Sequence, residues 1–344
     1  MTGGLAGQHP WSLLDRHARI PLTRMPTPLQ RLPHLSDRLG VRVAIKRDDL
    51  TDLALGGDKP RKLEYELAGP VRDGADWLVG CGSAQSNFAR LLTAAARRLG
   101  LGCSLILAAG EHPEDQGNLL TVRLMGADVR LVDTDDVWDL DAQCLALCAD
   151  LRQQGHRPHY VPVSGTTPTG CLGYVRAGFE LAAQLDESRF QPDALYVPFG
   201  TGGIAAGIAI GLHTAGKNIP LIGCSVNRPA SDCAEQFDTL VPKIQTLLGF
   251  SPPRLEIEIR DDQLGDGYGK VTDNCLAAIT DLAQTEGILL DPVYSGKVAA
   301  TLLADCRSGR WPSGANVIML HSGGVPALFA YHNDISRQPH AVLG

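Results

Sequence analysis

The chain has 344 residues, which is enough for two domains or one large one, and its 44% hydrophobic and 20% charged residues are typical of a soluble globular protein. Thirty-one basic and 38 acidic residues give a net charge of −7 with no long run of either sign, so neither a nucleic-acid partner nor a membrane surface is expected. The first residues lack a signal-peptide core and no stretch reaches the ~20 apolar residues that span a bilayer, so we expect a cytosolic protein.

From residue 77 onward, short apolar runs alternate with amphipathic stretches of ten or more residues, which is the pattern of parallel strands joined by crossover helices. The runs expected as strands are, in chain order, 77–82, 103–109, 128–133, 159–163, 194–200, 220–226 and 316–324. The helices expected between them are 83–100, 112–126, 139–155, 169–185 and 202–216. We therefore predict an α/β protein with two lobes, a crossing between them near 163–169, and a ligand site just beyond the strand ends.

The nine cysteines are odd in number and lie mostly in apolar runs. The sequence has no C-x-x-C pair, and Cys144 with Cys148 has no second pair nearby to complete a zinc site. We therefore expect reduced structural thiols and no metal.

The first segment of chemical interest ends in a lysine. Two glycines and Asp58 precede Lys59, and we expect Pro60 to keep Asp58 and Lys59 out of a regular helix that begins at Leu63. A lysine fixed on such a loop can form a Schiff base, because burial lowers its pKa. The alternative is a solvated lysine in a charged loop, which describes most lysines.

The second segment lies between an expected strand and an expected helix. Ser83, Gln85, Ser86 and Asn87 place four polar side chains in five positions, beside the free N–H groups of a helix start. This composition suits a carboxylate. The alternative is an N-cap alone, but an N-cap needs only one such residue, so the surplus favours a binding site.

The third segment is rich in glycine and follows the strand expected at 194–200. Gly200, Thr201, Gly202 and Gly203 let the backbone wrap an anion at a helix N-terminus, as in a phosphate-binding cup. A dinucleotide fold uses a similar loop but needs an acidic residue ~20 residues later, and residues 220–228 contain none. A single phosphate therefore fits better than a pyrophosphate.

The fourth segment carries two tyrosines and a serine near the C-terminal end. Tyr294 is a candidate general acid or stacking residue, Ser295 is expected to begin a helix, and Tyr268 lies upstream. The alternatives are a buried core phenol and a helix cap. Residues 321–324 again have the composition of a ligand-binding loop.

Together, these four segments resemble the pyridoxal-phosphate enzymes of fold type II, the tryptophan-synthase-β fold, in the branch that contains D-cysteine desulfhydrase and 1-aminocyclopropane-1-carboxylate (ACC) deaminase. The resemblance runs from residue 21 to residue 332. It implies two open, twisted, mostly parallel sheets flanked by helices, with pyridoxal 5'-phosphate in the cleft between the lobes. It also implies a homodimer, a large cofactor-binding domain of residues 1–61 and 170–344, and a small inserted α/β domain of residues 62–169.

The resemblance assigns roles residue by residue. Lys59 matches the lysine that links to the cofactor and later takes the α-proton, and Tyr294 matches an active-site tyrosine. Ser86 matches the serine that contacts the substrate carboxylate or assists proton transfer, and Asn87 matches the asparagine beside the cofactor's 3'-oxygen. The phosphate cup matches Gly200, Thr201, Gly202 and Gly203. The expected substrate-binding residues are Ser83, Gln85, Ser86, Asn87, Gln263, Tyr268 and Tyr294.

The position after the tyrosine separates the two branches of the family. The deaminase pattern has glutamate there, facing the pyridine nitrogen, whereas the desulfhydrase pattern has threonine, which Ser295 resembles chemically. A hydroxyl leaves that nitrogen largely unprotonated. The resemblance therefore favours α,β-elimination from a small β-substituted amino acid, giving pyruvate, ammonia and sulfide or a related leaving group.

Three positions depart from the family pattern: Gln263 replaces a tyrosine, Phe88 replaces histidine or glutamine, and Ile204 replaces a threonine. Because the first two change the expected substrate wall, ACC deaminase, a β-replacement enzyme and an amino-acid racemase stay open as alternatives. Outside this chemistry, the alternatives are a two-lobed ligand-binding protein and a nicotinamide-dependent dehydrogenase.

Overall fold

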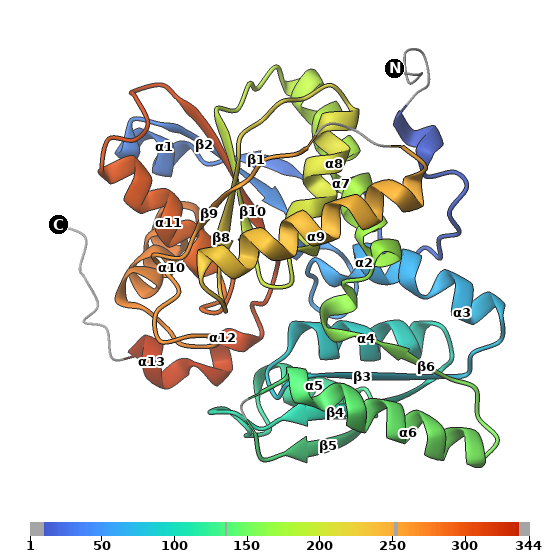
Figure 1. The fold of residues 1–344 in the computed structure, drawn as a ribbon. Coiled ribbons are helices and arrows are strands. Elements are labelled where there is room, and N and C mark those ends of the chain that lie inside the picture. Colours follow the sequence, from blue (N-terminus) through green and yellow to red (C-terminus); the bar gives the residue numbers. More distant parts are fainter. Residues whose placement is uncertain (1–9, 135, 251–253, 337–344) are drawn as a thin grey trace.

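Short apolar segments pair into two separate β-sheets in the computed structural model, which describes residues 10–134, 136–250 and 254–336 (Figure 1). The larger sheet has the order β1-β2-β10-β7-β8-β9, with bounds Leu29–Arg31, Arg42–Arg47, Asn316–His321, Ala194–Phe199, Leu221–Ser225 and Glu258–Arg260. The smaller sheet has the order β5-β4-β3-β6, with bounds Asp128–Val132, Gly102–Ala108, Trp77–Ser83 and Pro158–Val161.

All paired strands run parallel except β1 with β2. The seven predicted strands are present, because continuous apolar runs are what a sheet covered on both faces requires. Strands β1, β2 and β9 were not predicted. Strand β2 has arginine at both ends and Lys46 within it, so its sequence does not look buried, yet Lys46 is almost completely enclosed.

Helices flank both sheets, as the predicted fold class requires (Figure 1). The upper lobe in Figure 1 contains α7 to α11 around the larger sheet, and the lower lobe contains α4 to α6 around the smaller one. The helices are α1 Pro33–Leu39, α2 Lys59–Glu66, α3 Ala68–Arg72, α4 Asn87–Arg98, α5 Gly117–Leu124, α6 Asp141–Gln153, α7 Pro168–Ser188, α8 Gly203–Thr214, α9 Ala230–Leu248, α10 Asp273–Glu286, α11 Ser295–Arg307, α12 Ala327–Ala330 and α13 His332–Ser336. Within the described ranges, none of the helices has the length and apolar character needed to cross a membrane.

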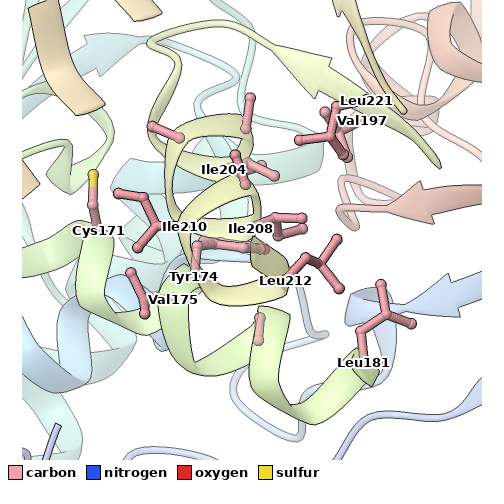
Figure 2. Close-up of a cluster of buried hydrophobic side chains, with 14 of the residues drawn as sticks. Cys171, Tyr174, Val175, Leu181, Val197, Ile204, Ile208, Ile210, Leu212 and Leu221 are labelled. Carbon is pink, nitrogen blue, oxygen red and sulfur yellow. The ribbon is translucent and has the colours of Figure 1, made fainter. Parts of the chain in front are cut away.

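Helix α8 is held against α7 by a fully buried apolar cluster that includes Tyr174, Ile208 and Leu212 (Figure 2). The two backbones approach so closely that a Cβ on Gly178 would lie 2.8 Å from the Cα of Gly211. Tight packing of this kind fixes a helix along its whole length. The N-terminus of α8 is therefore a rigid platform.

One local prediction was wrong. Helix α2 begins at Lys59, not at Leu63, and Pro60 lies in its first turn. Proline fits there because its missing N–H would have had no intrahelical acceptor and its fixed φ suits the helix. The predicted domain boundaries at residues 61 and 169 fall inside α2 and α7 respectively.

A buried network of charges fixes α2 from behind. Arg61 donates to both oxygens of Asp48 at 2.9 and 2.8 Å and to both oxygens of Glu180 at 3.0 and 2.9 Å. Lys46 also donates to Glu180, and Tyr174 donates to Asp48 at 2.8 Å. Two cations thus balance two carboxylates with almost no exposure to water, which makes the network self-contained.

We expect Arg61→Met to lower the free energy of unfolding by about 3–5 kcal/mol, because it leaves two buried carboxylates facing Lys46 alone. Denaturant titration followed by circular dichroism measures this loss. The matched control is Arg72→Met, which removes an ion pair with Asp73 at the surface and should leave stability unchanged. Equal stability of the two variants would contradict a structural role for the network.

Candidate active site

A cavity of about 330 Å³ lies where the carboxyl ends of strands from both sheets face each other. It collects segments that follow β3, β7, β8 and β10, together with the start of α2. The predicted site residues that line it are Lys59, Ser83, Ser86, Asn87, Gly200, Thr201, Gly202, Gly203, Tyr268 and Tyr294. Residues separated by more than 200 positions in sequence therefore meet in one place.

Lys59 is the first residue of α2 and is 6% exposed. Its Nζ donates to both oxygens of the neighbouring Asp58 at 2.7 Å and lies 5.8 Å from the centre of the Tyr294 ring. The backbone N–H of Asp58 donates to the carbonyl of Ser322 at 3.0 Å, which ties the lysine to the end of β10. The solvated-lysine alternative is therefore excluded for Lys59.

The serine-rich segment forms the start of α4 and faces the cavity. Ser86 is the N-cap, and its Oγ accepts a hydrogen bond from the N–H of Ala89 at 3.2 Å. The N–H groups of Asn87 and Phe88 belong to the first helical turn, where no intrahelical acceptor is available. The segment is thus both a cap and a set of donors suited to an anion.

The glycine-rich segment forms the loop between β7 and the N-terminus of α8. Gly202 has φ = 79°, a left-handed conformation that side chains disfavour, and it turns the loop into the helix. A Cβ on Gly203 would lie 3.0 Å from the Nζ of Lys62. The hydroxyl of Thr201 is hydrogen-bonded to Thr166 at 2.5 Å, which fixes this side of the loop.

Lys62 was missed by the sequence reading, although it lines the cavity. It lies three positions after Lys59 on the same helix, and this spacing places both lysines on one face. Its Nζ donates to Thr166 Oγ1 at 2.9 Å and to the carbonyl of Ser164 at 3.3 Å. Burial, and secondly the charge of Lys59, lowers the pKa of Lys62 to about 8. The spacing was the available signal, but the helix was expected to begin only at Leu63.

Two tyrosines close the side of the cavity opposite the glycine-rich loop. The hydroxyls of Tyr268 and Tyr294 are 3.0 Å apart, and the two rings meet edge to face. Burial raises the pKa of Tyr268, and burial together with the neighbouring Tyr268 raises that of Tyr294 well above its usual value. Both phenols therefore carry their protons at neutral pH.

Three predicted site residues lie outside the lining of this cavity. Gln85 lines a neighbouring cavity of about 130 Å³ and hydrogen-bonds the backbone of residues 112, 116 and 118. Gln263 is buried and donates to Asp262 at 3.0 Å, and its Oε1 has no partner among the described residues. Ser295 begins α11 as predicted and donates its hydroxyl proton to Asp291 at 2.6 Å. Its predicted role beside the cofactor remains a prediction.

The departures from the family pattern also separate in space. Phe88 and Ile204 both line the cavity, whereas Gln263 does not. Trp138 and Asn227 line it as well and were not predicted. Trp138 stacks under the guanidinium of Arg228, which lies 4.5 Å from the ring centre. All nine cysteines are free and buried, as expected.

Comparisons with known proteins give the family. Residues 20–323 match the family described as "Pyridoxal-phosphate dependent enzyme". The chain is 39% identical to a D-cysteine desulfhydrase of Klebsiella pneumoniae, over 93% of this chain and 98% of that one, and 38% identical to one of Salmonella newport over the same shares. Its structure resembles a crystal structure titled as an ACC deaminase homologue, with a TM-score of 0.88, 35% identity, and coverage of 95% of this chain and 98% of that one.

A more distant structural relative shows the fold alone. The threonine deaminase isoform 2 of Solanum lycopersicum aligns with a TM-score of 0.68 at 20% identity, covering 91% of this chain and 83% of that one. The nicotinamide-dependent dehydrogenase and the non-catalytic binding protein considered above are thus replaced by an enzyme family with a defined cofactor.

The cavity fits pyridoxal phosphate. The Gly200–Gly203 backbone at the start of α8 and the cation of Lys62 match a phosphate dianion, and only a residue without a Cβ leaves that space open at 203. Lys59 supplies a primary amine within the same cavity, and Asn227 offers a buried Oδ1 without a partner in the described part of the chain. The chain belongs to the family of pyridoxal-phosphate dependent enzymes.

Proposed function

We propose that this protein is a carbon–sulfur lyase that cleaves D-cysteine, or a closely related β-substituted amino acid, by α,β-elimination. The overall reaction converts cysteine and water into pyruvate, ammonia and hydrogen sulfide. The observation that carries the proposal is a buried lysine, Lys59, in one cavity with a carboxylate-sized donor set, a phosphate cup and two protonated phenols. The similarity to the D-cysteine desulfhydrases named above supports the substrate class.

Bound pyridoxal phosphate supplies an electron sink that stabilises the charge left on the α-carbon when its proton departs. The phosphate is held by the N–H groups of residues 200–203, the Thr201 hydroxyl and Lys62. The substrate carboxylate is received by the Ser86 hydroxyl and the free N–H groups at the start of α4. Together these contacts fix both ends of the reacting unit.

Lys59 is the proposed base, because its amine, once displaced from the cofactor by the substrate, stands free beside the α-carbon. Asp58 accepts hydrogen bonds from it in the resting arrangement and so orients it. Tyr294 is the proposed acid or orienting group for the leaving sulfur, since its raised pKa keeps the phenol protonated. Tyr268 holds the Tyr294 hydroxyl at 3.0 Å. Ser295 belongs to the proposal as the residue near the pyridine nitrogen.

Incubation of the purified enzyme with D-cysteine, L-cysteine, L-cysteate and ACC, scored for keto acid and for sulfide or sulfite, tests the proposal. We expect equal amounts of pyruvate and sulfide from D-cysteine. α-Ketobutyrate from ACC would restore the deaminase alternative. Interconversion of amino-acid enantiomers without keto acid would indicate a racemase. Cysteine consumption only with an added nucleophile would indicate β-replacement.

Lys62 predicts a pH dependence of cofactor binding. Its pKa of about 8 means that it is charged below pH 8 and neutral above, and a bound phosphate favours the charged form. Affinity should therefore fall by up to ~10-fold per unit as pH rises above 8. The probe is 4-deoxypyridoxine 5'-phosphate, which cannot link to Lys59. We expect Lys62→Met to bind it more weakly at pH 7 and without this extra slope.

The control for Lys62 is Lys243→Met, an exposed lysine on α9, which should follow the unchanged protein at every pH. Identical slopes for Lys62→Met and the unchanged protein would remove Lys62 from the phosphate site. As a further part of the proposal we infer a cytoplasmic homodimer, as the family resemblance implies. Sedimentation analysis measures the assembly state.

A further inference from the structure

Arg90 is a fully buried cation that no sequence motif marked. It lies on α4, one turn after Ser86 and Asn87, and its side chain is completely enclosed. The guanidinium donates to Asn118 Oδ1 at 2.7 Å, to the carbonyl of Gly56 at 2.9 Å, and to the carbonyl of Ala54. All three acceptors are uncharged, so the desolvation of Arg90 is offset by hydrogen bonds alone. A cation kept in such a place demands a reason.

The two carbonyls belong to a loop with an unfavourable backbone. Ala54, Leu55, Gly56 and Gly57 have φ values of 40°, 69°, 71° and 134°, four positive values in succession. Alanine and leucine rarely adopt such conformations, and these persist only where the surroundings enforce them. This loop leads directly into Asp58 and Lys59, so its position sets the position of the lysine.

The other partner of Arg90 leads to the carboxylate-binding segment. Asn118 donates from Nδ2 to Asn87 Oδ1 and to the carbonyl of Gln85, each at 2.8 Å. Its backbone N–H donates to Gln85 Oε1 at 2.9 Å. One continuous set of hydrogen bonds therefore runs from the lysine loop through Arg90 and Asn118 to the start of α4.

We propose that Arg90, together with Asn118, is a positioning residue that holds Lys59 at a fixed distance from the carboxylate-binding start of α4. Arg90 touches neither substrate nor cofactor in this account and acts through the loop of residues 54–57. The inference rests on the proposed function of Lys59 and Ser86. Displacements of about 1 Å at reacting groups cost as much as ~100-fold in rate, which sets the expected scale.

The test compares Arg90→Met and Arg90→Lys with Arg97→Met. Arg97 lies on the same helix, is exposed, and also donates to a backbone carbonyl, that of Gly126 at 2.9 Å. We expect kcat for pyruvate formation to fall ~10- to 100-fold in both Arg90 variants, with KM for the cofactor changed much less. The visible circular dichroism of the bound cofactor should change as well. Arg97→Met should match the unchanged protein in every measurement.

A second readout does not need the cofactor. Hydrogen–deuterium exchange of the apoprotein should be faster in residues 51–58 of the Arg90 variants, and unchanged there in Arg97→Met. If Arg90→Met does not fold, Arg90→Lys, which keeps the charge but loses the fork, and Asn118→Ala carry the test. Unchanged kcat and unchanged exchange in folded Arg90→Lys would overturn the inference. An unchanged protein that makes no keto acid would instead overturn the proposed function, leaving the exchange result to judge the loop.

Discussion

Replacing Lys59 with alanine should abolish the absorption band of the lysine-bound cofactor and lower pyruvate formation by ~10³-fold or more. The residue is the amine that holds the cofactor and, in the proposed mechanism, the base that takes the α-proton. Its burial at the start of α2 means that no other primary amine can take the same position without moving the helix. Absorbance spectroscopy and a coupled pyruvate assay measure the two effects.

The matched variant is Lys59→Arg. Arginine keeps a cation beside Asp58, which otherwise loses the partner at 2.7 Å, and so separates loss of chemistry from loss of stability. A guanidinium does not deprotonate in proteins and forms no such linkage. We therefore expect Lys59→Arg to fold and to be as inactive as Lys59→Ala. An active Lys59→Arg enzyme would refute the assignment of Lys59 as cofactor link and base.

Replacing Gly203 with valine should weaken binding of pyridoxal phosphate by ~100-fold or more. A Cβ at this position would already lie 3.0 Å from Cys171 Sγ and Lys62 Nζ and 3.1 Å from Thr166 Cγ2, and valine adds two further methyl groups. These atoms would occupy the space into which the N–H groups at the start of α8 point. Titration of the apoprotein with cofactor, followed by absorbance, measures the loss.

Two companion variants make the Gly203 result specific. Gly203→Ala adds only the Cβ and should give an intermediate loss, since its neighbours need to move by only a few tenths of an ångström. Gly69→Val is the control, because nothing lies within 4 Å of a Cβ at that position in α3. Normal cofactor affinity in Gly203→Val would place the phosphate elsewhere.

The sequence was most informative where one physical requirement governs many residues. Strands buried on both faces need apolar runs, so β3 to β8 and β10 were predictable from composition alone. The glycine-rich loop at 200–203 was predictable for a similar reason, because only a bare backbone can wrap an anion at a helix start. Domain boundaries at residues 61 and 169 stay a prediction.

Buried charged residues defeated the same reading. Lys46, Arg61 and Arg90 each look like solvent-exposed positions, because burial of a charge depends on partners far away in sequence, such as Glu180 for Lys46. Lys62 was missed for a local reason, since Pro60 was expected to delay the helix that places it beside Lys59. Gln263 and Ser295 show the reverse error in expectation: their segments approach the site, but their side chains are engaged with Asp262 and Asp291.

The most direct test of the account is borohydride reduction of the cofactor-loaded enzyme, followed by peptide mass mapping. Reduction converts a lysine–cofactor linkage into a stable secondary amine, so the modified residue can be identified after proteolysis. The account predicts a phosphopyridoxyl group on Lys59 in the unreacted enzyme, and loss of that labelling when D-cysteine is present during turnover. A label on Lys62, or an enzyme that takes up no label while still releasing sulfide from D-cysteine, would contradict it.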